Sequence, residues 1–514
     1  MSPFLSHFLF TISAILPVII YMGGYPRVSP ATGGVLSFLP RRRYNKSSLR
    51  AAGRARQIER AGIFMRTVIK GGFVVDPKNG VNSKQNIIIE DGRVAALTPL
   101  EPGGADAVID AEGKVVSPGF IDIHMHEDPI DEASGDIRVC IFDCMLRMGV
   151  TTVVAGNCGQ NVCEPADYLD AVDRAGAPVN VAMLAGHTML RNIAGARDKY
   201  ARISTEQLEA LCKKTEEQLD RGCAGISYGL RYVPGTGEEE LHGTARLCRK
   251  GGKMIAAHIR DDAEGVFAAA DELIEAGRKF GLNTQISHIG SMAGFGQMER
   301  FLQKVDAERA NGLRLHCDCY PYYAFSTRIG ETTYDEGFLE RYRADYSVVE
   351  LCEGKYRGRS CTKEIFDELR RDAPLTLTVC RVMLPEEIDM AVVQPGVMIA
   401  SDGLLSSGQG HPRAAGCFPR FLGKYAGSRM PLYDAVAKIT ALPAEKAGLC
   451  GKGGIGAGAD ADIVIFDPAE VRDNSTFEAP TTPPSGISCV MIGGEVAFAD
   501  GKIVNDKLGR SLRL

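Results

Sequence analysis

Short apolar runs alternate with amphipathic helical patterns between residues 118 and 450. Apolar runs of about four to eight residues bounded by turn residues predict buried strands, and strands that alternate with helices are typical of parallel α/β folds. Ser204 and Gln207 have capping-box spacing ahead of one helical pattern, which predicts a helix start there. Eight such runs predict a (β/α)8 TIM-type barrel. The predicted strands are residues 120–126, 151–157, 180–187, 225–230, 253–260, 283–289, 314–322 and 397–403.

A different pattern occupies residues 65–117 and returns in residues 451–514: short β-rich pieces joined by glycine and other turn residues. Segments of one style at both ends indicate a small β-sandwich built from both termini, with the barrel of residues 118–450 inserted between its parts. The run LTLTVCRVM (375–383) also has strand character and lies between the seventh and eighth predicted strands, so it is a further candidate strand in that gap.

Residues 1–64 follow neither pattern, and we expect them to form an extension outside the fold. Residues 8–22 form an apolar run interrupted by Pro17, which is short for a membrane span and lacks the basic flank of a secretory signal. Residues 41–60 are rich in arginine and poor in acids, as an organelle leader or the cytoplasmic flank of a membrane anchor also is. Those two functions are the alternatives to a non-essential extension.

Composition narrows the class of protein. The 514 residues are 45% hydrophobic and 24% charged, ordinary proportions that exclude a disordered or multi-span membrane chain. The net charge is −5, and residues 1–64 hold nine Lys or Arg and one acid, so the remainder is distinctly acidic, which argues against nucleic acid as a partner. Fifteen cysteines without a repeating framework favour reduced thiols and a cytoplasmic location.

Metal-binding residue types stand at the ends of most predicted barrel strands, where a TIM barrel keeps its chemistry. His124 and His126 are two apart on a strand, so both imidazoles face one side and can share an ion. His258 and His288 lie one βα repeat apart and can converge on a cation. Asp402 ends the last strand, a suitable place for a carboxylate that takes a proton from metal-activated water.

Three other residues each have two interpretations. Cys158, just after the second strand, is a thiolate ligand for zinc or a small buried hydrophobe. His187 contacts the substrate or caps the next helix. Arg413 holds a substrate carboxylate through a two-pronged contact or lies on the surface. The economical interpretation of the whole set is a metal site that activates water.

The motifs PGFIDIHMH, GVTTVVAGNCGQN, GISYGLRYVPG, HIRDD, QISHIG, SDG and GHPRAAGCFPRFL, in this order, resemble those of the amidohydrolase superfamily, and more narrowly of the D-aminoacylase (N-acyl-D-amino-acid deacylase) family. The resemblance covers residues 65–514. It implies zinc-dependent hydrolysis of a linear amide, with a small-molecule N-acyl amino acid or related amide as substrate. It further implies a tightly held zinc bound by Cys158, His258 and His288, and a second, weaker metal position at His124, His126 and Asp402.

The resemblance also implies roles for individual residues. Asp402 is the general base, and Tyr232, Tyr320 and Arg413 hold the acyl amino acid, with Arg413 on its carboxylate. One departure matters: the family commonly has a lysine that assists the substrate carboxylate where this sequence has Gly290. Arg413 must then pair with the carboxylate alone, which weakens the case for a simple N-acyl-D-amino acid.

Two other functions compete with a linear-amide hydrolase. Cyclic amide hydrolases such as dihydroorotases and hydantoinases generally use a carboxylated lysine, and the fourth strand, GISYGL, has no lysine. A non-enzymatic protein of the same fold is expected to lose metal ligands, whereas every motif ligand is present here. The sequence leaves the oligomeric state open.

Overall fold

The computed structural model describes residues 66–131, 133–135, 137 and 140–514. The expectations for residues 1–64 therefore concern residues outside the described part of the chain. Within that part, no helix is both long enough and apolar enough to cross a membrane.

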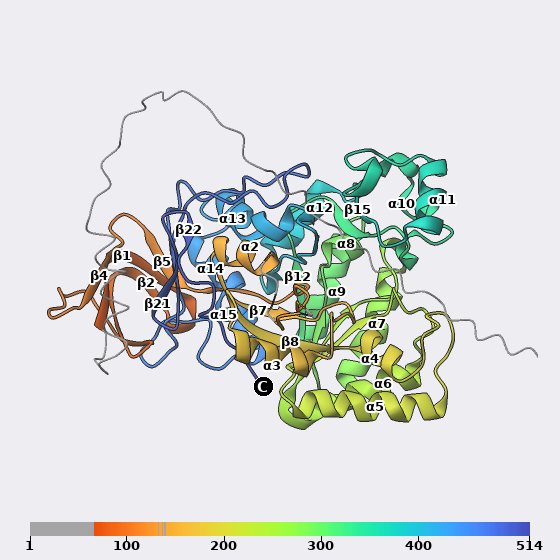
Figure 1. Ribbon diagram of the computed structural model, residues 1–514, viewed down its shortest axis with the longest axis horizontal. Coiled ribbons are helices and arrows are strands. Elements are labelled where there is room, and N and C mark those ends of the chain that lie inside the picture. Colours follow the sequence, from red (N-terminus) through yellow and green to blue (C-terminus); the bar gives the residue numbers. More distant parts are fainter. Residues whose placement is uncertain (1–65, 132, 136, 138–139) are drawn as a thin grey trace, which may run out of the picture. The chain divides into compact units, whose positions relative to one another are not determined.

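Eight parallel strands form the central sheet, in the order β16-β12-β11-β10-β9-β8-β7-β6 (Figure 1). All eight predicted strands are present, which confirms the barrel. Every residue of β7 and β8 is buried, as expected for parallel strands covered on both faces. The strands are β6 (Phe120–Asp122), β7 (Val150–Ala155), β8 (Asn180–Gly186), β9 (Gly225–Gly229), β10 (Met254–His258), β11 (Asn283–Ile286), β12 (Leu315–Cys319) and β16 (Val397–Ile399).

The seam between the first and last strands is closed just beyond the ends of β6 and β16. Met125 and Gly403 form a parallel bridge there. The backbone N–H of Asp402 donates to the carbonyl of His124 at 2.8 Å, and that of His126 donates to the carbonyl of Gly403 at 3.0 Å. The residues that close the barrel therefore include three of the candidate metal ligands, His124, His126 and Asp402.

Amphipathic helices cover the barrel. In α7 (Val266–Phe280), Val266, Ala269 and Leu273 are buried at helical spacing, and the helix ends at Gly281, whose φ of 67° suits a glycine. The predicted capping box opens α5 (Thr205–Asp220), with both reciprocal hydrogen bonds of Ser204 and Gln207 present. The other principal helices are α2 (Ile141–Arg147), α3 (Pro165–Ala175), α4 (His187–Ile193), α6 (Glu238–Ala245), α8 (Gly290–Ala293), α9 (Met298–Ala310), α12 (Pro385–Val393), α13 (Arg413–Tyr425), α14 (Leu432–Ile439) and α15 (Ala441–Ala447).

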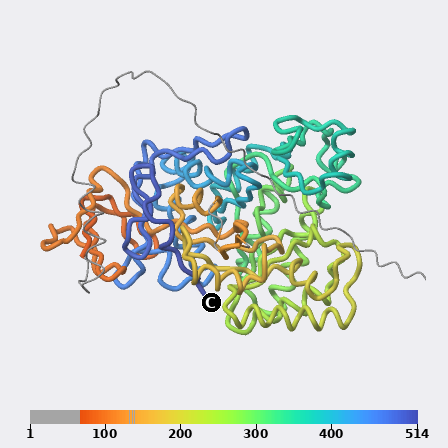
Figure 2. The backbone as a smooth tube through the Cα atoms, viewed as in Figure 1, coloured from red at the N-terminus to blue at the C-terminus, as the bar shows by residue number. Residues whose placement is uncertain are grey.

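Strands from both ends of the chain form a second unit, and the orange and dark-blue backbone segments lie side by side in Figure 2. The join is the antiparallel pairing of β5 with β19. Ile69, Ile87, Val116 and Ile463 belong to an apolar core separate from that of the barrel. The strands are β1 (Arg66–Asp76), β2 (Val81–Glu90), β3 (Arg93–Thr98), β4 (Ala107–Asp110), β5 (Val115–Pro118), β19 (Ile463–Phe466), β20 (Ile487–Ile492), β21 (Glu495–Ala499) and β22 (Lys502–Ile503).

A long insertion separates β12 from β16. It contains the antiparallel sheet β13-β15-β14 and the helices α10 (Phe338–Tyr342) and α11 (Lys363–Asp372). The run LTLTVCRVM forms β15 (Leu377–Cys380) of this sheet, between β13 (Phe325–Arg328) and β14 (Val349–Leu351), and adds no strand to the barrel. The insertion supplies one wall of the pocket described next.

Candidate metal centre and active site

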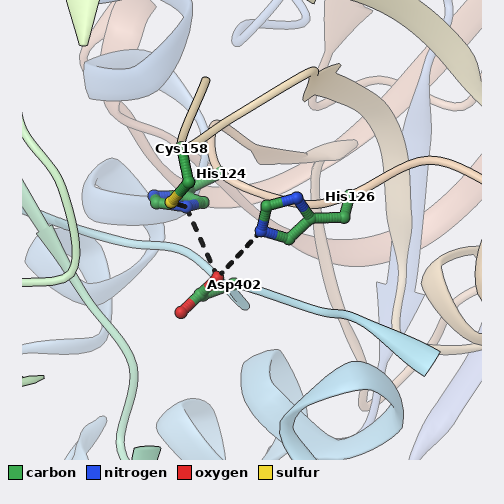
Figure 3. A group of neighbouring side chains, drawn as sticks. All are labelled: His124, His126, Cys158 and Asp402. Carbon is green, nitrogen blue, oxygen red and sulfur yellow. Dashed lines mark hydrogen bonds and ion pairs between the residues drawn. The ribbon is translucent and has the colours of Figure 1, made fainter. Parts of the chain in front are cut away.

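Two overlapping groups of ligand-type side chains lie at the C-terminal ends of the barrel strands. The first is His124, His126, Cys158 and Asp402, which point toward one another in Figure 3. One carboxylate oxygen of Asp402 lies 3.4 Å from Nε2 of His124 and 3.3 Å from Nε2 of His126. Three of these residues lie just beyond the ends of β6 and β16, where the barrel seam holds them together.

The second group is Cys158, His258 and His288, all of them buried. Sγ of Cys158 lies 3.5 Å from Nε2 of His288 and 3.5 Å from Nε2 of His124, so the thiol belongs to both groups. A tetrahedral ion with bonds of about 2.0 to 2.3 Å keeps its ligand atoms about 3.3 to 3.8 Å apart. The observed spacings therefore suit a metal ion such as zinc.

Electrostatics favour the metal-binding forms of Cys158, His258 and Asp402. Burial opposes ionisation of Cys158, but the imidazoles of His124 and His288 lower the pKa of this thiol well below its usual range. Burial lowers the pKa of His258 to about 4, which keeps its ring neutral. Burial also opposes ionisation of Asp402, yet Arg413 and then His124 hold the pKa of the carboxyl well below its usual range. Thiolate, neutral imidazole and carboxylate are the forms that bind metals.

Three of the ligand-type residues have a left-handed backbone that is uncommon outside glycine. The φ angles are 54° at Cys158, 35° at His288 and 47° at Asp402. Such angles at non-glycine residues cost energy and persist where the surrounding structure enforces them. At each of these positions the chain turns sharply after a strand and aims the side chain into the mouth of the barrel.

Two carboxylates that the sequence analysis did not select hold the ligands in place. Asp318 at the end of β12 is fully buried, lies 3.3 Å from Nδ1 of His124, and accepts a hydrogen bond from the backbone N–H of His288 at 2.9 Å. Glu127 accepts hydrogen bonds at 3.0 Å from the backbone N–H groups of Gly156 and Val162, on either side of Cys158. The available signal was an acid inside or directly after an apolar strand, in LHCDC and HMHED.

All of the ligand residues except His124 line a pocket of about 350 Å³. Barrel residues form one side of it, including His126, His258 and Asp402, and the insertion forms another side with Phe325 to Arg328, Glu331 and Tyr342. Leu375 also lines the pocket and is 67% exposed.

Two of the four predicted substrate-binding residues, Tyr232 and Arg413, line this pocket, and Tyr320 packs against Arg413. Tyr232 lines it and packs edge-on against His258, with ring centroids 4.6 Å apart. Arg413 also lines it, lies 2.9 Å from Asp402, and has its guanidinium 4.4 Å above the ring of Tyr320. His187 lies elsewhere: it begins α4, and its Nε2 is 2.9 Å from the carboxylate of Glu240.

Gly290 begins α8 and does not face the pocket. A Cβ added there would lie 3.0 Å from Ile388, 3.1 Å from Cys319 and 3.2 Å from Met383. A side chain at this position would therefore start out in apolar packing, and its neighbour Ser291 is the residue that lines the pocket. Gly290 supplies no cation to the site, and the arginine beside the ligand groups is Arg413, which lies 2.9 Å from Asp402.

Comparison with known proteins gives a consistent result. The amidohydrolase family model matches residues 107–221 and 396–498. N-acyl-D-glutamate deacylase from Alcaligenes xylosoxydans is 32% identical over 87% of this chain and 96% of its own length. D-aminoacylase from the same organism is also 32% identical, over 87% and 97%. The solved structure of N-acyl-D-glutamate deacylase from Bordetella bronchiseptica, complexed with zinc and a phosphonate inhibitor, has a TM-score of 0.78 at 30% identity and covers 87% of this chain and 99% of that one.

Proposed function

This chain belongs to the amidohydrolase family and, within it, to the N-acyl-D-amino-acid deacylases; from that premise we propose that it is a zinc-dependent enzyme that hydrolyses the linear amide bond of N-acyl-D-amino acids. The products are a carboxylate and a free D-amino acid. The observation that carries the proposal is the convergence of two ligand groups that share Cys158 in the pocket.

We assign the tightly held zinc to Cys158, His258 and His288, and a weaker metal position to His124, His126 and Asp402. A bound zinc ion polarises the amide carbonyl and lowers the pKa of water toward about 7. The donor set suits it, because thiolate and imidazole are the ligands that zinc prefers.

The protein's own residues move the proton and orient the substrate. Asp402 takes a proton from the attacking water on its carboxylate oxygen and delivers it to the departing amine nitrogen. Arg413 fixes the other carboxylate oxygen of Asp402 at 2.9 Å through one Nη. Its Nε and second Nη are buried and have no hydrogen-bond partner among the described residues. These two donors are available to the substrate carboxylate, in the two-pronged geometry that arginine favours.

We place the enzyme in the cytoplasm. All fifteen cysteines lie in the described part of the chain and are free thiols. Ten of them are buried, and the environment they suit is a reducing one.

The test is turnover by zinc-loaded protein on N-acetyl-D-amino acids with acidic, apolar and polar side chains, on their L-enantiomers, and on hydantoins. We expect D-selective release of free amine that is lost in Asp402→Asn. Ring opening of hydantoins without release of amine from any N-acyl amino acid would establish a cyclic amide hydrolase instead. Zinc-free protein that gains no activity on zinc addition would refute an enzymatic function.

A further inference from the structure

Most charged side chains that line the pocket are already engaged by the protein. Glu127 accepts backbone hydrogen bonds from the loop after β7. Asp262 accepts a hydrogen bond from the hydroxyl of Tyr342 at 2.6 Å. Arg413 is paired with Asp402 at 2.9 Å. These groups have structural or catalytic partners and are not free to select a second part of the substrate.

Arg328 and Glu331 are the exceptions. Both line the pocket and are partly buried, and neither side chain forms an ion pair or a hydrogen bond with another residue of the described chain. Lys199, Arg328 and Arg370 all act electrostatically on Glu331 without pairing with it, and Arg370 is bound to Asp335 at 2.8 Å instead. The pocket thus presents one uncommitted cation and one uncommitted anion, three residues apart in the chain.

These two charges line the same pocket as the ligand residues Cys158, His258 and Asp402. Tyr232, whose ring packs on His258, is under the electrostatic influence of both Cys158 and Glu331. Arg328 ends β13, which places it at the wall that the insertion contributes. A substrate whose amide bond is at the ligand groups can therefore extend past Tyr232 to Arg328 and Glu331.

On the basis of the deacylase function above, we propose that Arg328 and Glu331 bind a free α-amino-acid head group, an ammonium and a carboxylate on one carbon, at the substrate end remote from the cleaved amide. Partly buried charges without partners are costly, and a ligand with the complementary charges removes that cost. A carboxylate alone would pair with Arg328 but face Glu331, and an ammonium alone would meet the reverse conflict. A zwitterion pairs with both residues.

The head group can come from either half of the substrate. It can end the side chain of the D-amino acid, as in a diamino dicarboxylic acid acylated at its D-centre, or it can be part of the acyl group, as in a γ-glutamyl amide. In both cases the same bond is hydrolysed, and water supplies the proton and hydroxyl that the products gain. The two sources differ in which product carries the zwitterion.

The proposal is tested by measuring kcat/KM for a set of probes with the zinc-loaded full-length protein and dividing each value by that of a reference substrate. The probes are meso-diaminopimelate acetylated at its D-centre, γ-L-glutamyl-D-norleucine, N-acetyl-D-glutamate, Nα-acetyl-D-lysine and N-acetyl-D-norleucine as reference. We expect one of the two zwitterionic probes to have the highest kcat/KM, and which one it is identifies the source. In Arg328→Gln and in Glu331→Gln, the kcat/KM of that probe relative to the reference should fall about 10- to 100-fold.

Control variants separate charge recognition from general damage. Glu340→Gln removes an exposed carboxylate on α10, outside the pocket lining, and should leave the ratio unchanged. Arg328→Lys keeps the charge but loses the planar fork, so we expect an intermediate ratio. Thermal melts establish that each variant is folded.

Several results would overturn the head-group site. These are a best substrate among the glutamate, lysine or norleucine derivatives, or ratios that the Arg328 and Glu331 substitutions leave unchanged. Calorimetric binding of free meso-diaminopimelate to wild type and to Glu331→Gln tests the site without turnover. Binding that is lost in the variant, with no amide cleaved, would refute the deacylase function but support the head-group site.

Discussion

Asp318→Asn tests whether the buried carboxylate at the end of β12 positions the metal ligands. Asp318 is fully buried and makes three contacts: 3.3 Å to Nδ1 of His124, 2.6 Å to the side-chain amide of Gln285, and 2.9 Å to the backbone N–H of His288. With Nδ1–H of His124 directed at Asp318, the other nitrogen, Nε2, is left to face Cys158 and Asp402. An asparagine keeps the shape but replaces one acceptor with a donor.

The expected loss follows from these contacts. Hydrogen bonds to a charged group contribute about 1.5 to 3 kcal/mol each, and substitution of a residue that orients a metal ligand typically lowers metal affinity about 10- to 100-fold. We expect a loss of this size at the weaker metal position, which includes His124. The position held by Cys158, His258 and His288 should lose less, because Asp318 touches that group only through a backbone N–H.

Competition with a chromophoric chelator measures both zinc affinities. The matched control is Asp262→Asn, which removes another buried carboxylate at the pocket and leaves all imidazole contacts intact. If folded Asp318→Asn protein binds zinc within about twofold of wild type at both positions, the positioning role assigned from these distances is wrong.

Three further outcomes follow from the buried groups. Cys158→Ser should lose the tightly held zinc while Cys248→Ser, a buried thiol outside the site, keeps it; metal analysis after dialysis compares the two. Asp402→Asn should lower kcat about 10²- to 10⁴-fold with the tight zinc retained, which steady-state kinetics and metal content report together. Burial lowers the pKa of Lys438 to about 7, and among the described residues its ammonium donates a hydrogen bond only to the carbonyl of Gln394. The unfolded lysine keeps its proton to about pH 10.4, so stability should rise with pH from 7 to 10, and Lys438→Met should remove that rise and increase Tm at pH 7 in thermal melts.

The barrel was predictable from local pattern because each parallel strand is buried on both faces and reads as a continuous apolar run. β7 and β8 are examples, and both were predicted within a residue or two. The predicted strands ran past the observed ends in several cases: the first was expected to reach His126, but β6 ends at Asp122. Periodicity could not mark this boundary, because the residues that follow stay buried while they leave the strand to reach the seam and the metal site.

The same reasoning explains which site residues the sequence could suggest. His124, His126, His258 and Asp402 stand at strand ends, where position alone implies function. His187 also follows a strand end, yet its imidazole pairs with Glu240 on α6, a partner 53 residues away that local pattern does not indicate. Asp318 is the reverse case: it contacts a candidate metal ligand but was not selected from the sequence. Its neighbours Cys317 and Cys319 make the segment resemble ordinary core packing.

The pocket wall that the insertion contributes is the part of the site that local sequence pattern predicts least. Arg328 pairs in register with Leu377, so its place in the pocket depends on a strand formed almost fifty residues later. The segment TRIGETTYDEG contains charges and turn residues that would be equally ordinary on a solvent-exposed loop. We propose that the residues at the barrel ends carry out the hydrolysis, whereas the insertion between β12 and β16 determines which amide reaches them. Substitutions at residues 325–333 should therefore change the preferred substrate while the zinc content and the dependence on Asp402 stay the same.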